Sequence, residues 1–317
     1  MEKKRLFTVT LVRHGETMHN RDKIMQGQLD TQLSDLGEEQ ARLVGRRLND
    51  QRFTHAFSSD LSRASNTARK ILQENLGTAC ELTLDRRLRE RSFGYLEGRP
   101  FTDFKQAQQA SGLSQEMFTP EGGETVEQVY HRAKDFFQDL CRLMAEPLKD
   151  EAGLNDKDQE SSHFSSVTGS QSSLTKKVHS GALTDASNFI DLSPTCSSDS
   201  SSFGTQSQSS PFTTKFVNGQ DLKEVTDHVL IVSHGLLLRE LKRVILEKFH
   251  GVLEDAMATE APVVSPNTGV TSLTLSVNYK YGKVKVTCVE CHVINCTAHL
   301  CNGKKDLISH ALFKGAL

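Results

Sequence analysis

Two strand patterns constrain this chain most strongly, because each runs directly into a histidine. The first is LFTVTLV (residues 6–12), followed by Arg13 and His14, and the second is HVLIVS (residues 228–233), followed by His234. Apolar, β-branched runs of this length are typical of strands buried on both faces of a parallel sheet. Such sheets bind ligands beyond the carboxyl ends of their strands. The two patterns therefore predict two histidines in one crevice.

The segments between these runs alternate between strand and helix patterns, which predicts an α/β fold with a mostly parallel sheet. Helices are predicted after Ser34, which is a suitable N-cap, from Ala64 to the closing Gly77, and along the apolar stripe from Val126 to Leu143. Further strands are predicted at the segments THAFSS and ELTLD. SLTLSVNY and KVKVTCVECHV predict a hairpin at one sheet edge.

A serine-rich segment divides the chain. Between Ser161 and Ser210, 18 of 50 positions are serine, and no period of two or 3.6 residues persists. We expect residues 150–226 to be a disordered insertion, with a phosphorylation-controlled regulatory loop as the alternative interpretation. Residues 1–149 and 227–301 then form one domain, and 302–317 form a tail without a recognisable motif.

Composition excludes several classes of function. A net charge of -2 and a pI near 6.6 give no excess of positive charge of the kind that binds nucleic acid. No apolar run approaches the roughly 20 residues that span a bilayer, and we expect no transmembrane segment. Seven scattered cysteines favour reduced thiols in a cytoplasmic setting. Protein partners of the serine-rich segment have no support in the sequence.

Arg13 adjoins the first histidine, and Arg63 lies at another predicted strand-to-helix junction. Guanidinium groups bind phosphoryl oxygens with two hydrogen bonds, and phosphoryl transfer needs preorganised positive charge above all. A neutral imidazole, held in one tautomer by a backbone carbonyl, attacks phosphorus through its other nitrogen. For each single residue the alternative is an ordinary structural or surface role. Together they predict a phosphatase site.

Glu90, in RLRERSFGYLEG, is the candidate for the acid that protonates the leaving oxygen and then acts as the base. The alternative is an ordinary ion pair with Arg89 or Arg91. No carboxylate cluster suited to Mg²⁺ or Zn²⁺ is evident, so we expect neither a metal nor another cofactor.

The cysteines near the end of the chain suggest an alternative, a zinc site. Four of them, Cys288, Cys291, Cys296 and Cys301, lie close to His292 and His299. On a continuous strand, however, Cys288 and Cys291 point to opposite faces. They cannot chelate one ion without a turn between them, and we expect no zinc there.

The chain resembles the histidine phosphatase (phosphoglycerate mutase-like) superfamily in six segments. In order along the chain these are RHGETMHN, GQLDTQLSDLG, FSSDLSRASNTA, LRERSFGYLEG, PEGGET and VSHG. The resemblance implies a three-layer α/β/α sandwich. It also implies that His14 is the phosphorylated nucleophile, that Glu90 is the proton donor, and that a phosphate pocket is formed by Arg13, Arg63 and His234. Asn20, Gln26, Gly27 and Gly235 are implied at the substrate. The loop between the first strand and helix departs from the family pattern, because Gln32 replaces its usual proline.

Within the superfamily, the chain resembles fructose-2,6-bisphosphatases at the segments THAFSSDL, RLRER, FTP with GGET, and SPNTG. This resemblance implies that the protein hydrolyses a small phosphorylated sugar and thereby lowers glycolytic flux. It implies a location in the cytoplasm, with association with the nucleus or mitochondria as a further expectation. A bisphosphoglycerate phosphatase or mutase is the alternative, although residues 100–131 lack the arginine pair of mutases. A catalytically idle scaffold is the alternative of another class. For a second phosphate, the candidate cations are Arg21, Lys23, Arg99 or another loop cation, and the sequence does not distinguish them.

Overall fold

We describe the protein from a computed structural model. The structure describes residues 3–75, 77, 80–145, 225, 227–247, 259, 261–280 and 283–301. These residues all belong to one compact unit, Met1–Leu148 with Lys215–Leu317. The predicted insertion at 150–226, apart from Val225, and the tail at 302–317 lie outside the described residues, so both stay predictions.

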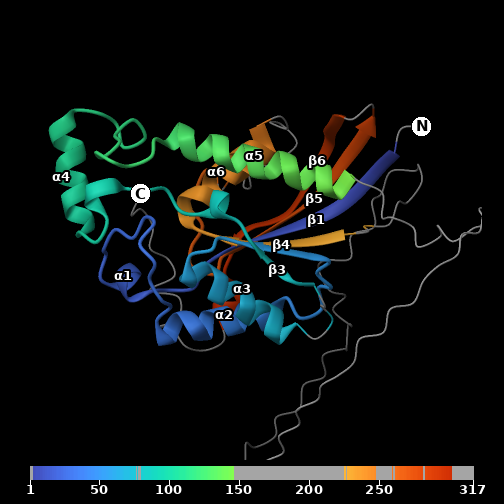
Figure 1. Ribbon diagram of the computed structural model, residues 1–317. Helices are drawn as coiled ribbons and strands as arrows, with labels where there is room; N and C mark the ends of the chain where they lie inside the picture. Colours follow the sequence, from blue (N-terminus) through green and yellow to red (C-terminus); the bar gives the residue numbers. More distant parts are fainter. Residues whose placement is uncertain are drawn as a thin grey trace, which may run out of the picture. The chain divides into compact units, whose positions relative to one another are not determined.

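A six-stranded sheet with the order β3-β2-β4-β1-β5-β6 forms the centre of this unit (Figure 1). The strands β1 to β4 run parallel to one another, whereas β5 is antiparallel to β1 and β6 is antiparallel to β5. The predicted, mostly parallel sheet with a hairpin at one edge is therefore confirmed. The strands are β1 (Lys3–Arg13), β2 (His55–Ser58), β3 (Leu82–Leu84), β4 (Asp227–Ser233), β5 (Val270–Lys280) and β6 (Lys283–Cys296).

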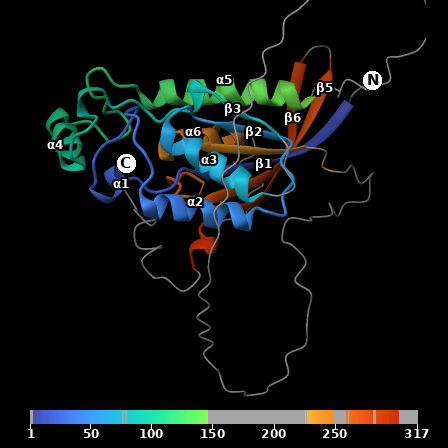
Figure 2. The ribbon, with the colours of Figure 1, turned by 60° about the horizontal axis from the view of Figure 1, so that its bottom comes forward.

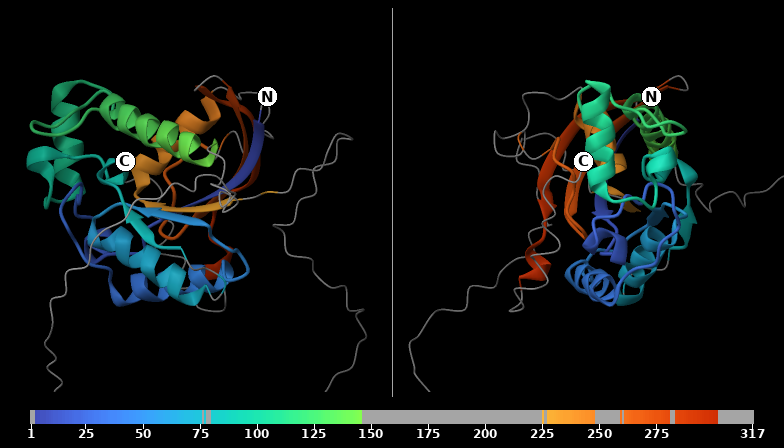
Figure 3. Two further views of the ribbon diagram at one scale, coloured as in Figure 1. Left: turned by 45° about the vertical axis from the view of Figure 1, so that its right-hand side comes forward. Right: turned by 90° about the vertical axis from the view of Figure 1, so that its left-hand side faces the viewer.

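Helices cover both faces of the sheet and complete the three-layer sandwich (Figures 1 and 2). One face carries α2 (Asp35–Arg47) and α3 (Ser62–Glu74), and the other carries α5 (Val126–Ala145) and α6 (Gly235–Leu246). Two further helices, α1 (Met18–Arg21) and α4 (Phe101–Ser111), lie beyond the carboxyl ends of the parallel strands (Figure 3). Short 3₁₀ helices are η1 (Arg86–Leu88), η2 (Gly94–Leu96) and η4 (Ala298–Leu300).

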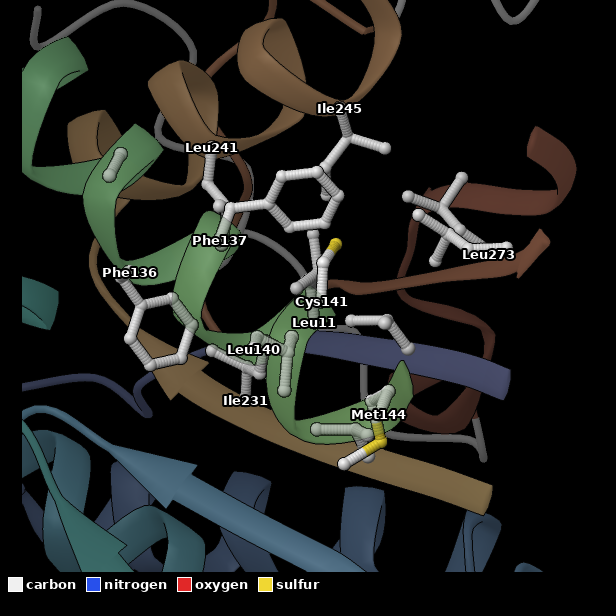
Figure 4. Close-up of a cluster of buried hydrophobic side chains, with 14 of the residues drawn as sticks. Leu11, Phe136, Phe137, Leu140, Cys141, Met144, Ile231, Leu241, Ile245 and Leu273 are labelled. Carbon is white, nitrogen blue, oxygen red and sulfur yellow. The ribbon is translucent and has the colours of Figure 1, made fainter. Parts of the chain in front are cut away.

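The larger hydrophobic core lies between α5, α6 and the sheet (Figure 4). Burial of these side chains holds the sheet against both helices, because apolar area removed from water contributes roughly 25 cal/mol per Å² to the stability of the folded state. From α5 come Phe136, Phe137, Leu140, Cys141 and Met144, from α6 Leu241 and Ile245, and from the strands Leu11, Ile231 and Leu273. The Phe pair of α5 is thus part of the core.

Two predictions about helices were wrong. The helix α3 ends at Glu74 and not at Gly77, because the Asn75 side chain donates hydrogen bonds to the carbonyl oxygens of Leu48 and Gln51, at 2.8 and 2.6 Å. These bonds hold Asn75 in an extended conformation that stops the helix. Leu143 of α5 is also 43% exposed, so it does not belong to the buried stripe.

The two leucines of α5 allow a matched test of the core. Leu140 is 3% exposed and Leu143 is 43% exposed, three residues further along the same helix. We expect Leu140→Ala to lower the free energy of unfolding by about 2–5 kcal/mol, through lost burial and a residual cavity. Leu143→Ala should change it by about 0.5 kcal/mol or less. Urea titration measures both, and equal losses would contradict the assigned core.

Candidate active site

The pairing of β1 with β4 brings the two predicted histidines together. Arg13 lies opposite Ser233 in the register, and the backbone N–H of His14 donates to the carbonyl oxygen of Ser233 at 2.9 Å. His14 and His234 therefore leave neighbouring strands at the same level. Their ring centroids are 5.1 Å apart, and both side chains are buried.

The imidazole of His14 is held in one orientation by its own loop. Its Nδ1 lies 2.7 Å from the carbonyl oxygen of Gly15, so Nδ1 carries the proton and donates a hydrogen bond to that oxygen. The Nε2 atom then keeps its lone pair. Burial and the charges of Arg63 and Arg13 lower the pKa of His14 well below its usual 6.5. The ring is therefore neutral at pH 7, as a nucleophile requires.

The two predicted arginines lie at the same site and keep donors for an anion. Arg13 donates through Nη1 to the carbonyl oxygen of Ser265, and Arg63 donates through Nη2 and Nη1 to those of Gly27 and Leu29. The Nε atoms of both arginines have no hydrogen-bond partner within the described part of the chain. Burial lowers the pKa of Arg63 to about 10, which leaves it charged at neutral pH.

His234 lies beside His14 and is also a neutral, buried group. Neither of its ring nitrogens has a hydrogen-bond partner among the residues that the structure describes. Burial, together with the charges of Arg63 and Arg13, lowers the pKa of His234 well below 6.5. Buried polar atoms without partners are rare and need an explanation. Here the unpartnered atoms of His234 belong to a ring beside that of His14, which lines the same pocket as Arg13 and Arg63.

The carboxylate of Glu90 is fixed by backbone donors at the start of α6. It accepts hydrogen bonds from the N–H groups of Leu236, Leu237 and Arg91, at 3.2, 3.3 and 2.8 Å. The alternative interpretation, an ion pair with its arginine neighbours, is wrong. Arg89 pairs with Asp60, and the Arg91 guanidinium donates to backbone carbonyl oxygens.

One pocket is lined by Arg13, His14, Arg63 and Glu90, with an empty volume of about 650 Å³, counted to its open mouth. His234 does not line it, because this ring is fully buried beside His14. Of the predicted substrate-binding residues, Asn20, Gln26 and Gly27 also line it. Gly235 does not; a Cβ atom there would come within 2.7 Å of the Val264 side chain, which does line the pocket, and would lie 3.5 Å from the Arg13 guanidinium, an ordinary contact. Gly27 adopts a positive φ of 50°, which places its carbonyl oxygen for the bond with Arg63.

Residues that the sequence did not single out for the site hold the His14 loop in place. The Asn267 side chain donates to the carbonyl oxygen of His14 at 2.9 Å, and the N–H of Thr268 donates to that of Arg13 at 3.1 Å. Thr67 of α3 accepts from the N–H of Gly15 at 3.0 Å. The Pro-Asn-Thr-Gly motif is the one sequence feature around Asn267 that we singled out, and it predicts a turn without indicating a contact with the His14 loop.

The predicted separation of Cys288 and Cys291 is confirmed. They lie opposite Ser276 and Leu273 of β5, which face different sides of the sheet, and Cys291 packs against the larger core. Within the described ranges, no three histidine, cysteine or acidic side chains are grouped as metal ligands. No described helix is long and apolar enough to cross a membrane.

The family model of the histidine phosphatase superfamily (branch 1) matches residues 9–147, which include Arg13, His14, Arg63 and Glu90. Curated members resemble the chain over nearly its whole length, beyond that match. The chain belongs to the histidine phosphatase superfamily. The resemblance inferred from its motifs is therefore confirmed.

Two similar relatives are both named fructose-2,6-bisphosphatase TIGAR. The protein of Xenopus tropicalis is 36% identical over 313 residues, covering 95% of this chain and 97% of the relative. That of Bos taurus is 35% identical over 304 residues, covering 94% and 98%. Each alignment extends across the serine-rich segment and the second histidine region.

Solved structures of low sequence identity share the fold. A mycobacterial glucosyl-3-phosphoglycerate phosphatase has a TM-score of 0.55 at 21% identity, covering 92% of this chain and all of that one. A phosphoglycerate mutase from Bacillus anthracis has a TM-score of 0.51 at 18% identity, covering 93% and 96%. These similarities support the phosphoglycerate mutase-like sandwich predicted from the sequence.

The lowered pKa values of the two histidines predict a pH dependence of stability. In the unfolded chain histidine titrates near pH 6.5, so below that pH the unfolded state binds more protons than the folded state. The free energy of unfolding should fall with decreasing pH, by up to about 1.4 kcal/mol per pH unit for each histidine. His234→Gln should reduce the slope of unfolding free energy against pH by the contribution of one histidine. Urea titrations in phosphate-free buffer measure it, and an unchanged slope would contradict the assignment.

Proposed function

We propose that the protein hydrolyses fructose 2,6-bisphosphate to fructose 6-phosphate and phosphate, through a phosphohistidine at His14. The observation that carries the proposal is the neutral His14 ring, which has Nδ1 bound to a carbonyl oxygen and lines a pocket together with Arg13 and Arg63. The relatives named fructose-2,6-bisphosphatase, similar over nearly the whole chain, support the choice of substrate.

In the first step Nε2 of His14 attacks phosphorus in line with the bond to the sugar oxygen. That P–O bond breaks, its electron pair stays on the sugar oxygen, and protonated Glu90 supplies the proton. Arg13 and Arg63 donate to the phosphoryl oxygens, where the charge is spread. The neutral His234 ring donates a further N–H. These donors are already in place, so little reorganisation accompanies the reaction.

In the second step a water molecule attacks the phosphohistidine. Glu90, now a carboxylate, takes a proton from that water, the N–P bond breaks, and its electron pair returns to His14. The three backbone N–H groups around Glu90 keep its carboxyl group at the pocket. Phosphate then leaves, and the starting protonation state is restored.

We further propose that Asn20, Gln26 and Gly27 contact the substrate and that Gly235 leaves room for the Val264 side chain in the pocket wall. The domain that acts comprises residues 1–149 and 227–301. We place the activity in the cytoplasm, on a small phosphorylated sugar as partner. The six described cysteines, which are all free thiols, support that compartment.

The direct test is phosphate release from fructose 2,6-bisphosphate, 2,3-bisphosphoglycerate and a monophosphate, in excess EDTA. We expect fructose 2,6-bisphosphate to be the best substrate, and His14→Ala to lower its turnover by at least about a thousandfold. His131→Ala, on an exposed position of α5, is the matched control and should keep full turnover. Exchange of phosphate without release would indicate a mutase, and no activity on any substrate would indicate a scaffold.

Glu90→Gln separates proton donation from phosphoryl transfer. With a sugar phosphate we expect the first step to slow by about 10²–10⁴-fold, because the leaving alkoxide needs a proton. With p-nitrophenyl phosphate the leaving group needs none, so a burst of p-nitrophenolate should precede slow hydrolysis of the phosphoenzyme. Stopped-flow absorbance measures both phases. An equal slowing of the first step with both substrates would contradict the role of Glu90.

A further inference from the structure

The segment that carries Glu90 is an irregular loop, and its shape depends on side chains from elsewhere in the chain. Glu90 lies between the short helices η1 and η2, outside any helix or strand. Backbone groups in such a loop need partners other than a regular ladder of hydrogen bonds. The side chains that supply these partners therefore determine where the Glu90 side chain begins.

Arg132 of α5 donates to three carbonyl oxygens of this loop. Its Nη1 donates to the carbonyl oxygen of Arg87 at 2.8 Å and also to that of Arg89. Its Nη2 donates to the carbonyl oxygen of Glu90 itself, at 2.9 Å. Because these oxygens lie within four consecutive residues, one guanidinium group holds the whole stretch of backbone that leads to Glu90.

The guanidinium group of Arg132 is in turn held by a carboxylate. Its Nε and Nη2 donate to the two carboxylate oxygens of Glu124, both at 3.0 Å. One of these oxygens also accepts from the backbone N–H of Ser92 at 2.9 Å. Arg132 thus makes five hydrogen bonds through all three of its nitrogens, and its planar shape fixes their directions. Its side chain is only 16% exposed, which limits competition from water.

A second side chain donates to the same carbonyl oxygen. The Nε2 atom of Gln28 lies 3.2 Å from the carbonyl oxygen of Glu90 and 3.3 Å from a carboxylate oxygen of Glu124. The Glu90 backbone is therefore held by donors from two segments that are far apart in the sequence. Neither Arg132 nor Gln28 belongs to the described lining of the pocket, whereas Glu90 does.

We propose that Arg132 is a positioning residue of the reaction, which holds the backbone of Glu90 so that the carboxyl group reaches the leaving oxygen. This inference rests on the proposed function, because it concerns the acid of the same reaction. The carbonyl carbon that Arg132 holds is bonded to the Cα atom of Glu90, so a shift of this backbone moves the carboxyl group as well. A misplacement of about 1 Å can cost about a hundredfold in rate. Loss of Arg132 should therefore impair proton transfer and spare the attack by His14.

The test compares two leaving groups. Arg132→Gln should slow the first step with fructose 2,6-bisphosphate by about 10- to 100-fold. With p-nitrophenyl phosphate it should slow that step by no more than about threefold, because p-nitrophenolate leaves without a proton. Since Glu90 is also the base of the second step, a burst of p-nitrophenolate should precede slow hydrolysis of the phosphoenzyme. Rapid quench with assay of fructose 6-phosphate, and stopped-flow absorbance, measure the two reactions.

Two further variants separate position from charge and from effects that do not involve Glu90. Arg132→Lys keeps the charge but carries its donors on one nitrogen, so it cannot reproduce the planar set of contacts. Its first step with the bisphosphate should stay closer to that of Arg132→Gln than to wild type, and a wild-type rate would contradict the inference. In the double variant of Glu90→Gln with Arg132→Gln, the slowing should match that of Glu90→Gln alone within about threefold, because Arg132 acts through Glu90.

The controls come from the same helix. Arg142 pairs with Asp139 on the exposed side of α5, so Arg142→Gln removes an arginine and an ion pair and should match wild type with both substrates. Leu140→Ala controls for lost stability. It should leave the ratio of the two first-step rates unchanged, although the midpoint of thermal unfolding falls.

Gln28→Ala keeps the test decisive if Arg132→Gln does not fold. It removes the second donor to the Glu90 carbonyl oxygen and should slow the bisphosphate reaction selectively, by about 2- to 10-fold, the effect of one neutral hydrogen bond.

The outcomes distinguish this inference from the proposed function. If Glu90→Gln slows the bisphosphate selectively but folded Arg132→Gln slows both substrates equally or neither, the inference is overturned and the proposed function stands. If Arg132→Gln does not fold, the same result with Gln28→Ala overturns the inference. If Glu90→Gln itself shows no selectivity between the two substrates, the proposed role of Glu90 is overturned and the inference with it.

Discussion

The parallel pairing of β1 with β4 is the constraint on which the site depends. Because Arg13 lies opposite Ser233, the chain leaves both strands at one level, and each strand delivers a histidine to the same place. The core between α5, α6 and the sheet holds this register, since a slip by one residue would turn every buried side chain to the other face. Packing far from the pocket therefore fixes the distance between His14 and His234.

Burial of unpaired positive charge is the second determinant. Arg13 and Arg63 line the pocket together with His14, and Glu90 is the acidic residue among its described lining. Burying the two guanidinium groups costs several kcal/mol per ion, and an anion bound between them offsets that cost. The same burial keeps both imidazoles neutral. One arrangement thus provides an attractive site for phosphate and an uncharged nucleophile for attack.

Much of this was predictable from sequence, because strand and helix periodicity is local and the residues at strand ends converge by topology. His14, His234, Arg13 and Arg63 were identified in this way, and the resemblance to the superfamily agreed. Other features depend on contacts between distant segments. The stop of α3 at Glu74 requires the carbonyl oxygens that Asn75 reaches, and the fact that Lys23 lines the pocket while Arg21 does not requires the fold of the loop that contains both.

The central claim is that Nε2 of His14 is aimed at phosphorus within a cationic pocket. A crystal structure of the protein with orthovanadate, which adopts the geometry of the phosphoryl-transfer transition state, tests it most directly. The account predicts a bond from vanadium to Nε2 of His14, with vanadate oxygens in hydrogen-bond contact with Arg13, Arg63 and His234. Vanadate bound at another place, or at this place without a bond to His14, would contradict it.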